Sequence, residues 1–158
     1  MGDFACAPWT RALAPDCSRL VACSTVPDVL IATDADWIFD EVDAALADEE
    51  TTVHRVRRGR DVSEAARRIQ PELIVLDMQI GNMGGIATAL SLEQEFEEGT
   101  TPWASILLLL DRPADVWLAR RWGVDGWLVK PLDAFRLRRA AAALLAGDEY
   151  KEPSGLAV

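Results

Sequence analysis

A run of four aliphatic residues that ends in an aspartate constrains this chain more than any other stretch. Residues 73–85 read Leu-Ile-Val-Leu-Asp-Met-Gln-Ile-Gly-Asn-Met-Gly-Gly. Four consecutive aliphatic residues predict a strand that is buried on both faces, and the Gly and Asn residues that follow predict a loop. Asp77 therefore stands at the carboxyl end of a buried strand, which is where open α/β sheets place their ligands.

Strand-like and helix-like segments alternate from Asp28 onward. Short apolar runs predict five strands, and apolar residues at helical spacing predict a helix after each of them. The alternation indicates parallel pairing through right-handed crossovers, so we expect an α/β fold, a five-stranded parallel sheet with helices on both faces. The predicted strands are residues 29–32, 52–56, 73–76 with Asp77 at the carboxyl end, 105–110 and 126–129. The predicted helices are residues 37–49, 62–69, 86–96, 114–122 and 132–146.

The length of 158 residues fits one domain with a short segment at either end. Residues 1–27 contain three prolines and no sustained periodicity, which indicates an N-terminal extension. The folded domain is expected at residues 28–147, followed by a C-terminal tail at residues 148–158. All three cysteines precede the domain and lack CxxC spacing, which favours reduced thiols in a cytoplasm and leaves a redox or metal role open. They are Cys6, Cys17 and Cys23.

Net charge and hydropathy limit the classes of partner that this chain can bind. The formal net charge of −10 and the pI near 4.5 argue against unaided binding to nucleic acid or to an anionic membrane surface. No stretch approaches the roughly 20 apolar residues that span a bilayer. We therefore expect a cytoplasmic protein that acts on other proteins, has no membrane insertion of its own, and reaches a membrane only through a protein partner.

Polar residues follow four of the predicted strands. Because the carboxyl ends of parallel strands share one edge of a sheet, these side chains are expected to converge. Clustered carboxylates raise one another's pKa values unless a cation intervenes, so the set suits a hard, oxygen-ligated metal such as Mg²⁺ with an ammonium nearby. The residues are Asp34, Asp36, Asp77, Asp111 and Lys130.

The ordered set of Asp34, Asp77 in its Leu-Asp-Met-Gln-Ile-Gly-Asn-Met-Gly-Gly context, and Val129-Lys130-Pro131 resembles the receiver domain of two-component response regulators, the CheY-like family. The resemblance covers about residues 28–147 and implies a (βα)5 flavodoxin-like receiver fold. It also implies that Asp77 accepts a phosphoryl group from a phosphohistidine and that Lys130 contacts this group.

The same resemblance implies a Mg²⁺ site. Its ligands would be Asp34, Asp77 and the backbone carbonyl of Gln79. The family's adjacent acidic pair aligns with Thr33 and Asp34, so one carboxylate is lost unless Asp36 reaches back to replace it.

Three further departures make this an atypical member. Gly81 replaces a loop proline, which predicts a less rigid loop, and Trp127 replaces a smaller switch aromatic. At the end of the fourth strand, Leu110 or Asp111 takes the place of a Ser or Thr whose hydroxyl bonds the phosphoryl group. An aspartate there would repel that group. One hypothesis is that Asp111 pairs with Lys130 and mimics or pre-empts phosphorylation; the alternative is that Asp111 points to solvent and switching is weak.

Tryptophan and arginine gather on the predicted fourth helix, fifth strand and fifth helix. Both residue types are enriched at interface anchors, and the resemblance implies that this face dimerises or binds targets. The alternative is that two of the three tryptophans belong to the core. The residues of this predicted interaction face are Trp117, Arg120, Arg121, Trp122, Trp127, Phe135 and Arg136.

Two functions fit these features. The first is a stand-alone receiver that acts by protein contacts after a histidine kinase phosphorylates Asp77; it is no enzyme beyond self-phosphorylation from a phosphodonor. The second is a phosphorylation-independent pseudo-receiver that serves as the accessory subunit of a larger complex. The lysine-poor, Ala/Arg-rich composition resembles orphan receivers of high-GC actinobacteria, some of which are similar to accessory proteins of the membrane-associated respiratory NADH:quinone oxidoreductase. A haloacid-dehalogenase-type hydrolase is excluded because Gln79 stands where that chemistry needs a second aspartate.

Overall fold

Six parallel strands form the central sheet of the computed structural model, which describes residues 27–152. Their order across the sheet is β2-β1-β3-β4-β5-β6. The predicted parallel sheet is confirmed, and it has one strand more than expected. The strands are β1 (Asp28–Ala32), β2 (Thr52–Val56), β3 (Leu73–Asp77), β4 (Ser105–Leu110), β5 (Gly126–Val129) and β6 (Tyr150–Lys151).

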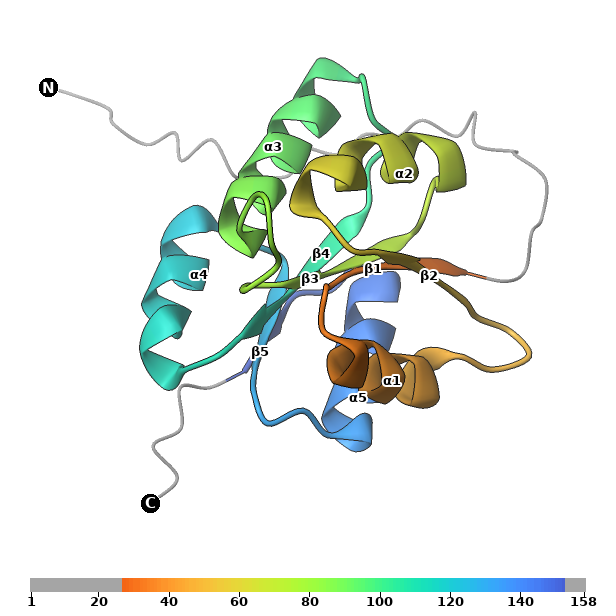
Figure 1. Ribbon diagram of the computed structural model, residues 1–158, viewed down its shortest axis with the longest axis vertical. Coiled ribbons are helices and arrows are strands. Elements are labelled where there is room, and N and C mark those ends of the chain that lie inside the picture. The colour runs from red at the N-terminus through yellow and green to blue at the C-terminus, as the bar shows by residue number, and fades with distance from the viewer. Residues whose placement is uncertain (1–26, 153–158) are drawn as a thin grey trace, which may run out of the picture.

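Helices cover both faces of the sheet (Figure 1). One face carries α1 (Asp36–Leu46) and α5 (Ala134–Leu145), which also contact each other. The other face carries α2 (Val62–Ile69), α3 (Gly85–Glu98) and α4 (Val116–Trp122). The predicted two-sided architecture is therefore confirmed.

The aliphatic residues of strand β3 pack into the hydrophobic cores on both faces of the sheet. Its side chains alternate between the two faces, so Ile74 and Leu76 join the core under α2 and α3, whereas Leu73 and Val75 join the core under α1 and α5. Every residue of β3 and β4 is buried. The strand that carries Asp77 is thus held on both faces and by a neighbouring strand on each side.

The short strand β6 differs from the expectation of a C-terminal tail. Tyr150 and Lys151 pair in parallel with Gly126 and Trp127 of β5. The approach is close, because a Cβ atom on Gly126 would lie 2.9 Å from the Tyr150 carbonyl oxygen. Residues 150–151 therefore belong to the sheet.

The N-terminal extension lies almost entirely outside the described residues. Its cysteines, Cys6, Cys17 and Cys23, are among the residues that the structure does not describe. Within residues 27–152, no helix is both long enough and apolar enough to cross a membrane.

Glu93 on α3 makes stability depend on pH. Burial raises the pKa of this carboxyl group from 4.5 to about 7, and the carboxylates of Asp125 and Glu97 add to the increase. Between these two pH values the folded chain therefore binds one more proton than the unfolded chain. We expect the free energy of unfolding to fall as pH rises through that window, by about 1–2 kcal/mol once the solvent exposure of Glu93 is discounted.

Urea unfolding at pH 5 and pH 7.5, followed by circular dichroism, measures this effect. Glu93→Gln should reduce the difference in unfolding free energy between the two pH values by about 1–2 kcal/mol. Glu98→Gln, at an exposed position of the same helix, is the matched control and should leave the difference nearly unchanged. An undiminished difference in Glu93→Gln would contradict the assignment.

Candidate functional site

Asp77 ends β3 beside the residue that follows β1. The register of these strands pairs Ala32 with Leu76, so Thr33 and Asp77 come next along the same edge. The Thr33 hydroxyl donates a hydrogen bond to Asp77 Oδ2 at 2.9 Å, and both residues are buried. The backbone amide of Gln79 donates to Asp77 Oδ1 at 3.2 Å. Both carboxylate oxygens of Asp77 therefore have partners.

Lys130 follows β5 at the same edge and bridges two carboxylates. Its backbone amide donates to the carbonyl oxygen of Leu110 at 2.8 Å, which sets it beside the end of β4. Its Nζ atom donates to Asp77 Oδ1 at 2.7 Å and to Asp111 Oδ1 at 2.8 Å. The predicted contact between Asp111 and Lys130 is thus present, while its consequence for phosphorylation stays a prediction.

The side chains that form the Asp77–Lys130–Asp111 bridge are largely shielded from solvent. The side chains of Lys130, Asp77 and Asp111 are 11%, 1% and 26% exposed. Burial alone would lower the pKa of Lys130, but hydrogen bonds and charge from Asp111 and Asp77 raise that pKa above its usual value. Lys130 is therefore an ammonium at neutral pH.

Only one of the two carboxylate oxygens of Asp111 has a hydrogen-bond partner among the described residues. Oδ1 bonds Lys130, whereas Oδ2 is buried and has no hydrogen-bond partner in the part of the chain that the structure describes. A buried acceptor without a partner costs about 1–3 kcal/mol. The residue that follows β4 is thus a carboxylate that is only half satisfied.

Asp36 is not brought to the site. Arg55 Nη1 and Arg57 Nη2 lie 2.7 Å and 3.0 Å from Asp36 Oδ1, and the hydrogen bond from Arg55, with the charge of Arg57, lowers the pKa of this exposed aspartate. Arg55 also donates from Nε to the carbonyl oxygen of Thr33 at 3.2 Å. Two arginines on the β2 side therefore hold Asp36, and it does not replace the carboxylate lost at Thr33.

Asp34 remains exposed next to the loop after β3. A Cβ atom on Gly81 would lie 3.2 Å from Asp34 Oδ2, so glycine in place of the family's proline leaves space for this carboxylate. The structure thereby explains one departure from the family pattern by another residue of the site.

The side chains present do not fit the predicted Mg²⁺ site. Mg²⁺ demands nearly octahedral oxygen coordination. Across residues 27–152, no group of three or more His, Cys, Asp or Glu side chains is placed to hold a metal ion. Of the predicted carboxylate ligands, Asp36 is bound by arginines, which leaves only Asp34 and Asp77. None of the chemistry proposed for this chain is therefore assigned to a metal.

Thr33 and Trp37 also contact the site residues, Asp77 and Lys130 respectively, although neither contact was predicted. The Trp37 ring centroid lies 5.8 Å from Lys130 Nζ, and this ring is exposed in the first turn of α1. A ring over an ammonium at this distance contributes about 0.5–1 kcal/mol. The position of Thr33 directly after β1 was a signal that could have pointed to its contact, whereas Trp37 lies within α1 and has no such signal.

The predicted interaction face contains exposed and buried parts. Trp117, Trp122 and Phe135 are 63%, 40% and 71% exposed, whereas Trp127 is 1% exposed. The Arg121 guanidinium lies 5.6 Å from the Trp117 ring centroid. One of the three predicted tryptophans therefore belongs to the core, and two remain on the surface of α4.

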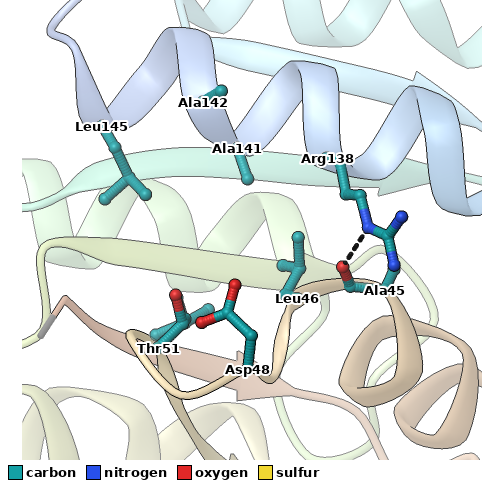
Figure 2. A pocket seen from close by; sticks show the side chains of 9 residues that line it. Ala45, Leu46, Asp48, Thr51, Arg138, Ala141, Ala142 and Leu145 are labelled. Atoms are coloured by element: carbon teal, nitrogen blue, oxygen red, sulfur yellow. Dashed lines mark hydrogen bonds between the residues drawn. The ribbon is translucent and has the colours of Figure 1, made fainter.

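The pocket in Figure 2 lies away from Asp77. It has a volume of about 230 Å³ and is lined by the ends of α1 and α5 and by the loop before β2. Arg138 closes one side by donating from Nε to the carbonyl oxygen of Ala45 at 2.8 Å (Figure 2). Val29 in the lining marks the amino end of β1, so the pocket belongs to the opposite edge of the sheet.

Sequence comparison identifies relatives of this chain. A family model for the response regulator receiver domain matches residues 29–142. The protein PilH of Pseudomonas aeruginosa is 25% identical over 119 residues, which are 75% of this chain and 98% of PilH. The nitrate/nitrite response regulator NarL of Escherichia coli K12 is 28% identical over 104 residues, 66% of this chain. The chain spans 47% of NarL, about half of its length.

Solved structures of receiver domains share this fold. The chemotaxis response regulator CheY4 of Vibrio cholerae superposes with a TM-score of 0.64 at 23% identity, covering 76% of this chain and 99% of CheY4. The isolated receiver domain of RcsB from Salmonella enterica serovar Typhimurium, solved with phosphomimetic BeF3⁻, gives 0.68 at 18% identity, covering 82% and 95%. The family match covers most of the domain, and Asp77 and Lys130, two of the residues that carried the resemblance, are in contact. The chain belongs to the response regulator receiver domain family.

Proposed function

We propose that this receiver transmits a two-component signal through protein contacts and that Asp77 is its phosphoacceptor. The observation that carries the proposal is the 2.7 Å contact between Asp77 Oδ1 and Lys130 Nζ at the carboxyl end of β3. A carboxylate at a strand end with a charged ammonium on it has both a nucleophilic oxygen and a positive charge for the incoming phosphoryl group.

Phosphorylation of Asp77 would move the phosphoryl group from a histidine nitrogen of the kinase to a carboxylate oxygen of Asp77. A carboxylate oxygen of Asp77 attacks the phosphorus of a kinase phosphohistidine, the P–N bond breaks as the O–P bond forms, and the departing imidazole takes up a proton. Lys130 offsets the negative charge that gathers on the phosphoryl oxygens.

A second candidate is a pseudo-receiver that binds its partner without phosphorylation. The observation that favours it is the contact of Lys130 with Asp111, because this carboxylate already occupies the ammonium that a phosphoryl group would need. None of the relatives and structures named above has a name that refers to a respiratory enzyme, so their names offer no support for the respiratory accessory role that composition suggested.

Intact mass measurement after incubation with acetyl phosphate and Mg²⁺ separates the two candidates. We expect wild-type protein to gain the mass of one phosphoryl group and Asp77→Asn to gain none. Asp40→Asn, which removes an exposed carboxylate on α1, is the matched control and should behave as wild type. An unmodified wild-type chain would favour the pseudo-receiver, and a modified Asp77→Asn would refute Asp77 as the acceptor.

A further inference from the structure

The chain beyond α5 returns to the edge of the sheet and is held there by contacts that phosphorylation does not require. The Trp127 indole Nε1 donates to the carbonyl oxygen of Glu152 at 3.1 Å, and the Tyr150 amide donates to the carbonyl oxygen of Asp125 at 3.1 Å. Trp127 is the core residue of the predicted interaction face. Residues 150–152 therefore cover the outer edge of β5 next to α4.

The Glu152 carboxylate anchors this segment. Oε2 accepts a hydrogen bond from the backbone amide of Val129 at 2.9 Å, and Oε1 accepts one from Arg136 Nε at 2.7 Å. Arg136 Nη2 also contacts Oε1, which makes the pair bidentate on the arginine side. Charge-assisted bonds of this kind are the stronger hydrogen bonds in proteins, and the Glu152 side chain is mostly buried.

Arg136 links this anchor to the candidate site. Its Nη2 donates to the carbonyl oxygen of Val129 at 2.9 Å, and its Nη1 donates to the carbonyl oxygen of Pro131 at 2.8 Å. These carbonyls flank Lys130, whose ammonium bridges Asp77 and Asp111. The C-terminal segment is thus joined to the backbone on both sides of Lys130 through a single arginine.

The edge of β5 is only partly used by β6. Two of the four residues of β5, Gly126 and Trp127, pair with β6, and the Glu152 side chain takes the Val129 amide in place of a further strand pair. An unpaired strand edge is a template for an added strand. A pocket of about 350 Å³ continues this edge toward α4 and is lined by Arg120, Gly123, Val124, Trp127 and Lys151.

We propose that residues 150–152 are a displaceable latch on the edge of β5, and that this edge docks an extended segment of a partner protein that carries a carboxylate in the place of Glu152. The latch itself shows the chemistry of the partner: a strand parallel to β5 followed by an acidic side chain for Arg136 and the Val129 amide. A longer strand pairs with all of β5 and so displaces the latch. This surface is independent of whether Asp77 is phosphorylated.

A peptide that copies the latch tests the proposal on the full chain. The probe is a fluorescent peptide of residues 147–156, Gly-Asp-Glu-Tyr-Lys-Glu-Pro-Ser-Gly-Leu, and its binding is followed by fluorescence anisotropy. Glu152→Ala in the protein weakens the latch, so the peptide should bind this variant at least about tenfold more tightly than wild type. Glu149→Ala is the matched control, because Glu149 is exposed and contacts only Lys151 among the ion pairs of the described residues; it should bind as wild type does.

Hydrogen exchange at Val129 reports the latch itself. In Glu152→Ala this amide should exchange about tenfold faster than in wild type, and in Glu149→Ala it should not change. If Glu152→Ala does not fold, Glu152→Gln replaces it with the same expected direction, because glutamine removes the negative charge that pairs with Arg136 but keeps an acceptor. Unchanged exchange at Val129, or no gain in peptide affinity, would overturn the proposal.

A third variant tests whether the peptide binds at the edge of β5. A Cβ atom on Gly126 obstructs any strand that puts its carbonyl where Tyr150 has it, 2.9 Å away. Adding Gly126→Ala to Glu152→Ala should therefore remove the gain in peptide affinity. A gain that persists in the double variant would place the peptide elsewhere and would equally overturn the docking surface.

Discussion

Replacing Lys130 with methionine should lower the free energy of unfolding by about 3–5 kcal/mol. The change keeps most of the aliphatic length of the side chain and removes the ammonium that contacts Asp77 and Asp111. Both carboxylates then lose their cation, and Asp77 is nearly inaccessible to water. Leaving a buried charge without its partner is far more costly than removing an exposed pair.

Urea unfolding monitored by circular dichroism measures the loss. Lys151→Met is the matched control, since it changes the chain's only other lysine, which is exposed and pairs with exposed Glu149. We expect it to cost less than about 1 kcal/mol. Adding Asp111→Asn to Lys130→Met should recover part of the loss, because one of the two unpaired charges is gone. Equal losses in the two lysine variants would contradict the bridging role of Lys130.

Much of this site could be predicted because parallel strands bring their carboxyl ends to one edge. Asp77, Asp111 and Lys130 are 53 residues apart at most, yet each follows a strand, and their contacts therefore follow from strand order. The strand was predicted at residues 73–76 with Asp77 at its carboxyl end, one residue short of the observed Leu73–Asp77, because a buried strand leaves an uninterrupted aliphatic run.

Other contacts left no pattern in the sequence. The proximity of Asp36 to Asp34 suggested a metal ligand, but the cation that holds Asp36 comes from β2, and side-chain choice between two neighbours is not visible in strand order. Strand β6 has two residues, too few to show a period of two. Its position depends on the small size of Gly126 and on the pairing of Glu152 with Arg136, both of which arise only once the chain is folded.

Asp111 shares one ammonium with the proposed phosphoacceptor, so we expect it to influence how readily Asp77 is phosphorylated. The phosphoryl group on Asp77 would carry about −1.5 to −2 charges at pH 7, in place of the single carboxylate charge, and three acceptor oxygens, which also need Lys130. A carboxylate at this position raises the free energy of that state in two ways: it repels the phosphoryl group, and it keeps Lys130 engaged. The unpartnered Asp111 Oδ2 shows that no hydrogen bond within the described residues offsets that repulsion at the second oxygen.

Replacing Asp111 with serine should therefore increase the rate of phosphorylation by acetyl phosphate about tenfold to a hundredfold. Two charges about 4 Å apart at an effective dielectric constant near 20 interact by about 4 kcal/mol, and a fraction of this energy, about 1.4–2.8 kcal/mol, accounts for the increase. Serine also supplies the hydroxyl that the family pattern has at this position. The initial rate of phosphoryl adduct formation, followed by intact mass, is the measurement.

Asp111→Asn separates charge from hydroxyl, because the amide removes the charge and retains nearly the same shape. If repulsion dominates, asparagine should recover most of the increase that serine produces; if the hydroxyl dominates, asparagine should recover little. Asp115→Asn is an unsuitable control because this carboxylate pairs with Arg112 before α4. Asp133 is exposed and caps α5 by accepting a hydrogen bond from the Phe135 amide at 2.7 Å. Serine can retain this cap, so Asp133→Ser is the matched control. Asp133→Ser should leave the rate at the wild-type value. If Asp111→Ser brings no increase, Asp111 does not limit phosphorylation, and the restraint would then lie in the burial of Asp77 itself.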